Sequence, residues 1–297
     1  MDNCRKDNNL AIRMLLEGNE LLAQNILRYN LKKYRCNMTL NNLGVFYCQN
    51  GMIQKNAKWK SAKRLGLRYL IEALQEDAVW QSYVSAATAL EENGDYRMAY
   101  KLLQTASSLK ADILVQYNIG VCLFRLGKML EAITVLEQLL ESETVKYIIA
   151  NGGQSPLIII IYAYIALGEN DKAINQLNCS HSKFHNDDRF DVFILQHLCG
   201  LHFNALHESE KLLAEWYPTS ALLAMLAESV NFEPAFNEKI IVSLPETFME
   251  EWREFLKKPK KRRRAISRYK YVPPYLMLYY YIKADKTVDG SVSSAND

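Results

Sequence analysis

The histidines of the chain are the residues best suited to metal binding or to proton transfer near neutral pH, and all five crowd into one short stretch. They are His181, His185, His197, His202 and His207. His181 and His185 flank a loop that ends in Asn186-Asp187-Asp188, where imidazole and carboxylate groups could together hold a metal ion. No tetrahedral ligand set is evident, however, and loop histidines are usually solvated. The sequence therefore predicts no metal site and no cofactor.

The six cysteines offer a second kind of chemistry, but their spacing does not favour it, because they form no C-x-x-C pair and no zinc-finger pattern with a histidine. Cys199 lies between His197 and His202. Helical spacing puts Cys199 on a different face from His197, so a buried thiol is favoured over a nucleophile. In a reducing compartment we expect all six to be buried or half-buried thiols: Cys4, Cys36, Cys48, Cys122, Cys179 and Cys199.

Several other function classes lack their sequence signals. The chain has no phosphate-cradling glycine loop, no H-E-x-x-H motif, no nucleophile elbow and no paired-carboxylate motif, so it is predicted not to be an enzyme. Met1 to Lys6 does not resemble the start of a signal peptide. The longest apolar run, Leu157 to Leu167, is about half of what a membrane-spanning helix needs. We therefore expect a cytoplasmic protein, or a nuclear one if the source is eukaryotic.

One segment is strongly basic: Lys257 to Lys270 contains nine Lys and Arg residues and no acidic residue, whereas the whole chain has a net charge of only +3. The segment is similar to a monopartite nuclear import signal. It could also bind the phosphates of nucleic acid or anionic lipid, or be a solvated linker. The residues concerned are Lys257, Lys258, Lys260, Lys261, Arg262, Arg263, Arg264, Arg268 and Lys270.

The elements that would position these residues follow a repeated pattern of large and small side chains. The template reads large-x-x-Leu-small-x-x-large, then eight residues, then Ala-x-x-x-large-x-x-small. Its clearest copy consists of Tyr83, Ala86, Ala87, Leu90, Ala99, Leu103 and Ala106. The next has Ile119, Gly120, Leu123, Ala132, Leu136 and Leu139, and a third has Leu157, Ile160, Ile161, Tyr164, Ala173, Leu177 and Ser180. Weaker copies precede and follow these, which predicts a series of helix pairs.

The positions of five glycines support the same division into helix pairs. Each glycine falls four residues after the last large residue of a first helix, and Asn204 takes that place in the sixth copy. Gly and Asn tolerate the left-handed conformation that ends a helix, so the chain should turn there. The glycines are Gly18, Gly51, Gly94, Gly127 and Gly168. Met52 to Ser61 is an insertion in the second copy, expected to be an exposed loop or a lengthened helix end.

This pattern resembles the tetratricopeptide repeat family over residues 4–230. The resemblance implies an all-α, right-handed superhelical solenoid of antiparallel helix pairs whose concave groove holds peptides or other protein segments; the alternative is a non-repetitive helical bundle. The domain of 1–245 would contain repeats at 4–35, 37–78, 80–112, 113–145, 154–186 and 190–220, and a degenerate one at 220–245. Residues 246–284 would form C-terminal helices, and 285–297 a disordered tail.

The resemblance also indicates which side chains line the groove, since one stripe of each first helix faces the concave side. These residues are apolar or aromatic: Val84, Tyr117, Val121, Phe124, Ile158, Tyr162 and Ile165. Repeats that clamp a terminal carboxylate carry Lys, Asn and Arg there, and only Asn41 and Arg125 remotely qualify. A groove of this kind suits an amphipathic helix. Alternatively, the apolar stretch Tyr275 to Ala284 of the same chain covers it.

We therefore predict a non-enzymatic scaffold that binds a peptide or an amphipathic helix in this groove. The alternative is a nucleic-acid-associated or nuclear-imported adaptor that acts through residues 257–270.

Overall fold

The computed structural model describes residues 2–53, 59–76, 78–179 and 189–201, together with Glu250, Arg253 and Lys257. The described residues form α-helices joined by turns and contain no strand, which confirms the all-helical fold. The first helices along the chain are α1 (Asp2–Leu16), α2 (Glu20–Tyr34), α3 (Asn37–Ile53), α4 (Trp59–Gln75), α5 (Trp80–Glu92) and α6 (Tyr96–Leu109). They are followed by α7 (Ile113–Arg125), α8 (Met129–Glu137), α9 (Ser142–Ala150), α10 (Pro156–Ala166), α11 (Asn170–Cys179) and α12 (Arg189–Leu198).

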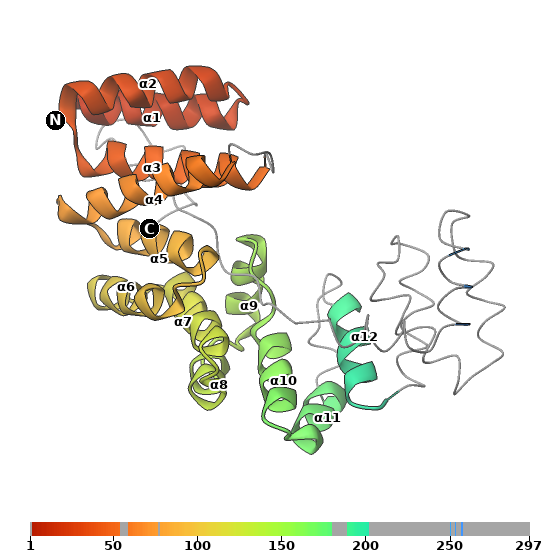
Figure 1. Ribbon diagram of the computed structural model, residues 1–297. Helices are drawn as coiled ribbons and strands as arrows, with labels where there is room; N and C mark the ends of the chain where they lie inside the picture. Colours follow the sequence, from red (N-terminus) through yellow and green to blue (C-terminus); the bar gives the residue numbers. More distant parts are fainter. Residues whose placement is uncertain are drawn as a thin grey trace. The chain divides into compact units, whose positions relative to one another are not determined.

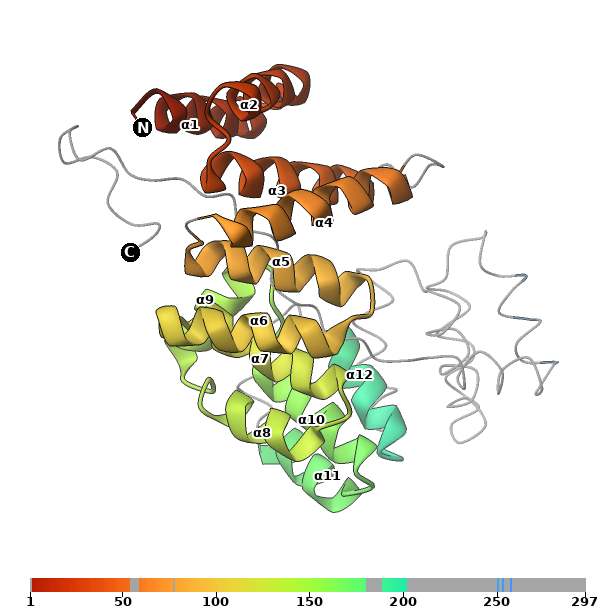
Figure 2. The same cartoon turned by 60° about the vertical axis from the view of Figure 1, so that its left-hand side comes forward.

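The first of two compact units ends at Val115 and is a stack of the helix pairs α1/α2, α3/α4 and α5/α6 (Figures 1 and 2). The pairs are joined by apolar clusters in which side chains of successive pairs meet. Leu27 of α2 shares one cluster with Leu43 of α3, and Leu70 of α4 shares another with Ala86 of α5. Each pair therefore buries its apolar surface against the next, as expected for a repeat.

The second compact unit begins at Gln116 and contains most of α7 together with α8 to α12. Here α10 packs on α8, while α11 and α12 pack on α10. Pro156 is at the start of α10, where its missing N–H and fixed φ suit the first helical turn. The short helix α9 intervenes between the α7/α8 and α10/α11 pairs.

The glycine register predicts where most first helices end. Gly127 has φ +76°, and beyond it the N–H of Lys128 donates to the carbonyl oxygen of Leu123 at 3.0 Å. This is the hydrogen bond of a Schellman turn. Positive φ at the predicted glycines Gly18, Gly94, Gly127 and Gly168 confirms four of the five turns.

Three details of the register differ from the prediction. Gly51 lies inside α3, because the inserted residues prolong the helix to Ile53. In the sixth pair the turn comes at Gly200, with φ +77°, and Asn204 lies outside the described residues. The chain between the fourth and fifth predicted pairs, to which the template assigns no helix, forms α9. The signal for α9 was present, because Gly152 follows the buried Ile148 by the same four residues.

The insertion of the second copy, Met52 to Ser61, lengthens the helices on both sides of it, α3 and α4. A lengthened helix end was one of the two forms predicted for it. α3 runs on to Ile53 and α4 begins at Trp59, and residues 54–58 lie outside the described part of the chain.

Small residues let the two helices of a pair cross closely, as the template predicts. A Cβ added at Gly120 of α7 would lie 2.6 Å from Cδ2 of Leu136 in α8. One added at Gly66 of α4 would lie 2.7 Å from the carbonyl oxygen of Gly44 in α3. At Gly66 two backbones therefore approach to a distance that only glycine permits, and at Gly120 the side chain of Leu136 packs directly against the backbone.

First and second helices differ sharply in burial. Every residue is buried from Asn37 to Cys48 in α3, Val84 to Glu91 in α5, Tyr117 to Leu123 in α7 and Pro156 to Ala163 in α10. The second helices of the pairs bury a narrow stripe and expose the rest, and the stripe of α6 consists of Ala99, Leu103 and Ala106. These four first helices are thus more deeply buried than the second helices, whereas α1 exposes one face.

Several predictions fall beyond the described residues. The degenerate repeat at 220–245, the tail at 285–297 and the apolar stretch Tyr275 to Ala284 lie entirely outside them. Of the C-terminal helices at 246–284, only Glu250, Arg253 and Lys257 are described, and each is helical. The basic segment therefore has one described member, the exposed Lys257.

Candidate protein-binding surfaces

The residues predicted to line the groove of the second unit form one stripe on α7 and one on α10, which we call the inner strip. Each stripe has the spacing i, i+4, i+7, which keeps its three side chains on one helix face. The inner strip consists of Tyr117, Val121 and Phe124 on α7 and of Ile158, Tyr162 and Ile165 on α10. Val84, the remaining predicted residue, belongs to α5 of the first unit.

Most of these side chains are covered in the structure. Tyr117, Val121 and Ile158 are 0% exposed and Tyr162 is 4% exposed, while Phe124 and Ile165 are half-buried. Val84 is also fully buried. Only the two ends of the inner strip, Phe124 and Ile165, therefore keep partly exposed side chains, and its role in partner binding stays a prediction.

Hydrogen bonds link three first helices of the second unit. The phenolic oxygen of Tyr117 in α7 accepts the backbone N–H of Gln154 at 2.9 Å, just before α10 begins. The side-chain amide of Gln154 donates to the carboxylate of Asp191 in α12 at 2.5 Å. Tyr117 thus has a structural role in addition to its predicted place in the inner strip.

An asparagine network holds the first unit together at α1, α2 and α3. The side-chain amide of Asn8 donates to the carbonyl oxygen of Cys4 and to Oγ1 of Thr39, both at 2.8 Å. Its own oxygen accepts from Asn42 at 3.2 Å, and Asn30 donates to the Cys4 carbonyl at 3.0 Å. Asn8, Asn30, Thr39 and Asn42 are all 0% exposed. Buried amides that satisfy one another fix the relative positions of the helices that carry them.

A similar polar contact joins the next pairs. The side-chain amide of Asn37 donates to the carbonyl oxygen of Ala73 in α4 at 2.6 Å, and the Ser82 hydroxyl of α5 donates to Asn37 at 3.2 Å. Lys63 and Glu92 form an ion pair between α4 and α5 at 2.5 Å, with both side chains largely buried. Sequence analysis found neither contact, since both depend on which helices become neighbours.

The cysteine and histidine predictions have mixed outcomes. All six thiols are free, and Cys4, Cys48 and Cys122 are buried, but Cys179 is exposed, contrary to prediction. Burial raises the pKa of Cys4 to about 11 and the pKa of Cys48 to about 12, so both are protonated at neutral pH.

Burial also raises the pKa of Cys199, which does not favour an activated nucleophile beside His197. No group of His, Cys, Asp and Glu suited to a metal ion occurs among the residues that the structure describes. His181, His185, His202 and His207 lie outside them.

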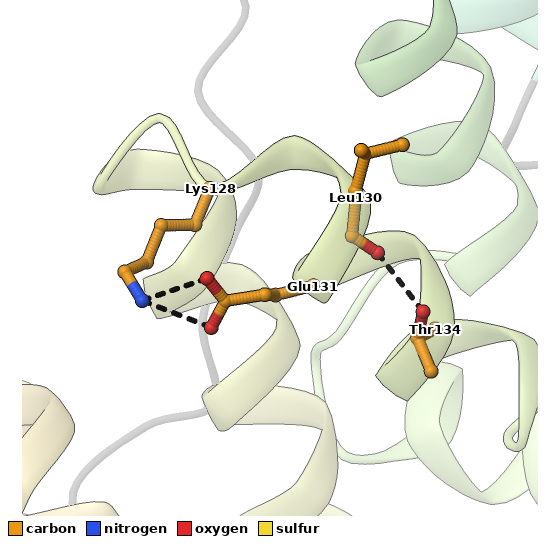
Figure 3. A network of polar contacts seen from close by, with 4 residues as sticks. All are labelled: Lys128, Leu130, Glu131 and Thr134. Atoms are coloured by element: carbon orange, nitrogen blue, oxygen red, sulfur yellow. Dashed lines mark hydrogen bonds and ion pairs between the residues drawn. The ribbon is translucent and has the colours of Figure 1, made fainter.

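The outward surfaces of the second helices are polar. At the start of α8 the Lys128 ammonium donates to both carboxylate oxygens of Glu131, at 2.7 and 2.9 Å, and the Thr134 hydroxyl donates to the carbonyl oxygen of Leu130 (Figure 3). The side chain of Leu130 is 67% exposed. In the first unit the corresponding surfaces are basic, which sequence analysis missed. The signal was present in equivalent positions: Arg64 and Arg68 flank Gly66 by two residues, as Arg97 and Lys101 flank Ala99.

The α7/α8 pair matches a known repeat: residues 114–143 match the tetratricopeptide repeat. A tetratricopeptide repeat protein from Parabacteroides merdae is structurally similar over 86% of this chain and 98% of its own, with a TM-score of 0.59 and 16% identity. This chain has a tetratricopeptide-repeat fold. Such repeats generally serve as non-enzymatic scaffolds for protein–protein interaction.

Two other solved structures are less similar. The APC/C hetero-tetramer Cut9-Hcn1 is 16% identical over 80% of this chain and 42% of its own, with a TM-score of 0.49. Naa15/Naa10 bound to HypK-THB is 12% identical over 86% of this chain and 38% of its own, with a TM-score of 0.42. No curated protein is significantly similar in sequence. None of the helices in the described ranges is both long and apolar enough to cross a membrane.

Proposed function

We propose that this chain is a non-enzymatic scaffold whose inner strip binds an amphipathic helix or an extended apolar segment of another protein. The observation that carries the proposal is the apolar character of the strip along its whole length on two first helices. The outward faces of the paired helices α8 and α11, by contrast, carry polar and charged side chains.

The composition of the strip indicates the kind of segment. Tyr117, Phe124 and Tyr162 supply large, rigid contact areas at a low cost in side-chain entropy. The strip contains no Lys, Arg or Asn that could hold a terminal carboxylate. An apolar helix face, with anchors spaced at i, i+3, i+4 and i+7, matches such a surface better than a charged peptide end does.

The half-buried residues indicate where a partner makes first contact. Phe124 and Ile165 are the last members of their stripes, at i+7 in each, and they are the two that retain exposed area. Deeper members such as Val121 become accessible only if the polypeptide covering them moves. The chain's own Tyr275 to Ala284 is one candidate cover, although it lies outside the described residues.

The proposal is tested by comparing what the full chain retains from extracts of its native host with what the Phe124→Ala variant retains. Truncating a central aromatic anchor can cost about 2 kcal/mol or more of binding free energy, so recovery of a strip-bound partner should fall strongly. Leu130→Ala is the matched control, since Leu130 is a large exposed apolar residue on the outward face of α8.

Recovery of one partner by the wild type and by Leu130→Ala, but not by Phe124→Ala, would support the inner strip. Equal recovery by all three proteins would refute it. If Phe124→Ala recovers the partner normally but removal of 271–297 destabilises the chain, the strip is covered by the chain's own C-terminal residues and is no partner site.

A further inference from the structure

The second helices of the first unit carry an unusual excess of positive charge. α2, α4 and α6 together contain nine Lys and Arg residues but only two acidic ones, Glu20 and Glu72. The second helices of the other unit differ, since α8 has two acidic residues and no basic one, and α11 has one of each. The charge therefore belongs to one part of the fold and is not a general property of its outward helices.

The basic side chains come from the second helices of three successive pairs, and shared core clusters join these pairs. Ile26 of α2 and Tyr69 of α4 pack against the same core cluster, and Leu74 of α4 and Leu102 of α6 pack against another. Both views show these pairs stacked in chain order (Figures 1 and 2). The solvent-facing sides of α2, α4 and α6 therefore belong to consecutive layers of one stack. We define the outer basic face by six of the exposed cations on these helices, next to which Lys33 of α2 is also exposed: Arg28, Lys32, Arg64, Arg68, Arg97 and Lys101.

Most of these cations lack an internal counter-charge. Within the described ranges, no carboxylate lies within ion-pair distance of Arg28, Lys32, Arg64, Arg97 or Lys101. Of the six, only Arg68 has an ion pair, with the carboxylate of Glu72 at 3.5 Å. The guanidinium of Arg35 approaches the same carboxylate at 3.1 Å. A single carboxylate held between two guanidinium groups shows the geometry that further carboxylates could adopt on this face.

Exposed apolar side chains are interspersed with the cations. Leu21 is 73% exposed and Tyr29 is 58% exposed on α2, and Met98 is 44% exposed on α6. Leu22, which follows Leu21 on α2, is 50% exposed. A partner should therefore offer mainly negative charge, together with a few apolar contacts.

We propose that the outer basic face binds an acidic segment of a partner protein, whose Asp and Glu side chains pair with the guanidinium groups. Arg predominates on the face, and its planar fork suits carboxylates, whereas attraction to a lipid surface needs only charge. Membrane insertion would need more apolar side chains than the isolated Ile71 and Met98 offer on α4 and α6. Nucleic acid would gain little from stacking, since Tyr29 is the one exposed aromatic residue among the face's described side chains. This surface is separate from the inner strip and belongs to the other unit.

The test measures binding of a fluorescein-labelled, glutamate-rich peptide to the full chain by fluorescence anisotropy. The Arg28→Glu/Arg64→Glu/Arg97→Glu variant should weaken binding at least about tenfold, because three attractive contacts become repulsive. The control Arg13→Glu/Lys146→Glu/Lys172→Glu changes the net charge equally at exposed positions elsewhere and should alter affinity less than about twofold. Circular dichroism verifies folding, and Arg64→Gln/Arg97→Gln is a milder second variant that should also weaken binding.

Two results would overturn the proposal. The first is an equal loss of peptide affinity in the reversal variant and its control, which would mean that only net charge matters. The second is tighter wild-type binding to phosphatidylserine-containing vesicles or to polyuridylate than to the peptide, lost in the reversal variant. The face would then be a lipid or nucleic-acid surface and not a protein-binding one.

Discussion

The phenolic oxygen of Tyr117 lies 2.9 Å from the backbone nitrogen of Gln154, although 37 positions separate the two residues along the chain. Through this hydrogen bond α7 contacts Gln154, two positions before α10 begins, and the Gln154 side chain continues the connection to Asp191 of α12. The aromatic ring predicted as a binding anchor thus also sets the spacing between successive helix pairs.

Removing the hydroxyl alone tests this structural role. We expect Tyr117→Phe to lower the free energy of unfolding by about 1 kcal/mol, because the N–H of Gln154 loses its acceptor while the ring still packs. Chemical denaturation measures the change. Tyr147→Phe on α9, where the side chain is exposed, should be neutral and serves as the control. A Tyr117→Phe variant as stable as the wild type would show that the bond contributes little.

The crossing of α3 and α4 leaves no room for a side chain at Gly66. In Gly66→Ala the new Cβ would lie 2.7 Å from the carbonyl oxygen of Gly44 and 2.9 Å from the backbone nitrogen of Cys48. Helix propensity favours alanine by about 1 kcal/mol, but overpacking against backbone costs about 1–3 kcal/mol, and backbone cannot move aside easily. We expect a net loss of melting temperature. An increase would mean that the two helices cross less closely than described.

Asn8 is the centre of the buried polar network of the first unit. Asn8→Ala should destabilise the chain by about 2–3 kcal/mol, since it leaves the Thr39 hydroxyl and the Asn42 amide with unmet hydrogen bonds in the core. Asn25→Ala on the exposed side of α2 is the matched control and should change stability by less than about 0.5 kcal/mol. Urea denaturation curves of both variants decide the matter, and equal midpoints would contradict the network's importance.

The Cys48 thiol should make stability depend on alkaline pH. Burial, reinforced by the Glu92 carboxylate and opposed by Lys63, raises the pKa of this thiol from 9.0 to about 12. A raised pKa keeps the folded form protonated, so its contribution is fully present below pH 9 and is lost as the pH rises towards 12. We therefore expect the stability difference between wild type and Cys48→Ala to fall over that range. A difference that is constant with pH would exclude a buried thiol.

The features predicted correctly from the sequence are those that depend on nearby residues. The turn at Gly127 needs only a glycine four positions after Leu123, because the hydrogen bond that ends the helix spans five residues. Close crossing at Gly120 follows from the same template. The turn predicted at Gly51 was wrong, because the insertion after this glycine lets α3 continue to Ile53. The length of such an extension does not follow from the neighbouring residues alone.

The features that could not be predicted depend on distant contacts. The template puts Tyr117 and Val121 on a stripe that should face the groove, but their complete burial depends on everything that surrounds α7. Likewise, Arg64 and Arg97 belong to the same stack of helices only because the α3/α4 and α5/α6 pairs pack on each other. Charge at equivalent template positions could have indicated this face before the structure was known.

The most direct test of the central proposal, that the inner strip binds another polypeptide, is photo-crosslinking from position 124 in cells of the native host. A benzoyl-phenylalanine replacing Phe124 should form an adduct heavier than the chain, and mass spectrometry should find a segment of another protein attached at that position. The same photoreactive residue replacing Leu130 should give no such adduct. Crosslinks from position 124 that join only residues of the same chain, with none to another protein, would contradict the proposal.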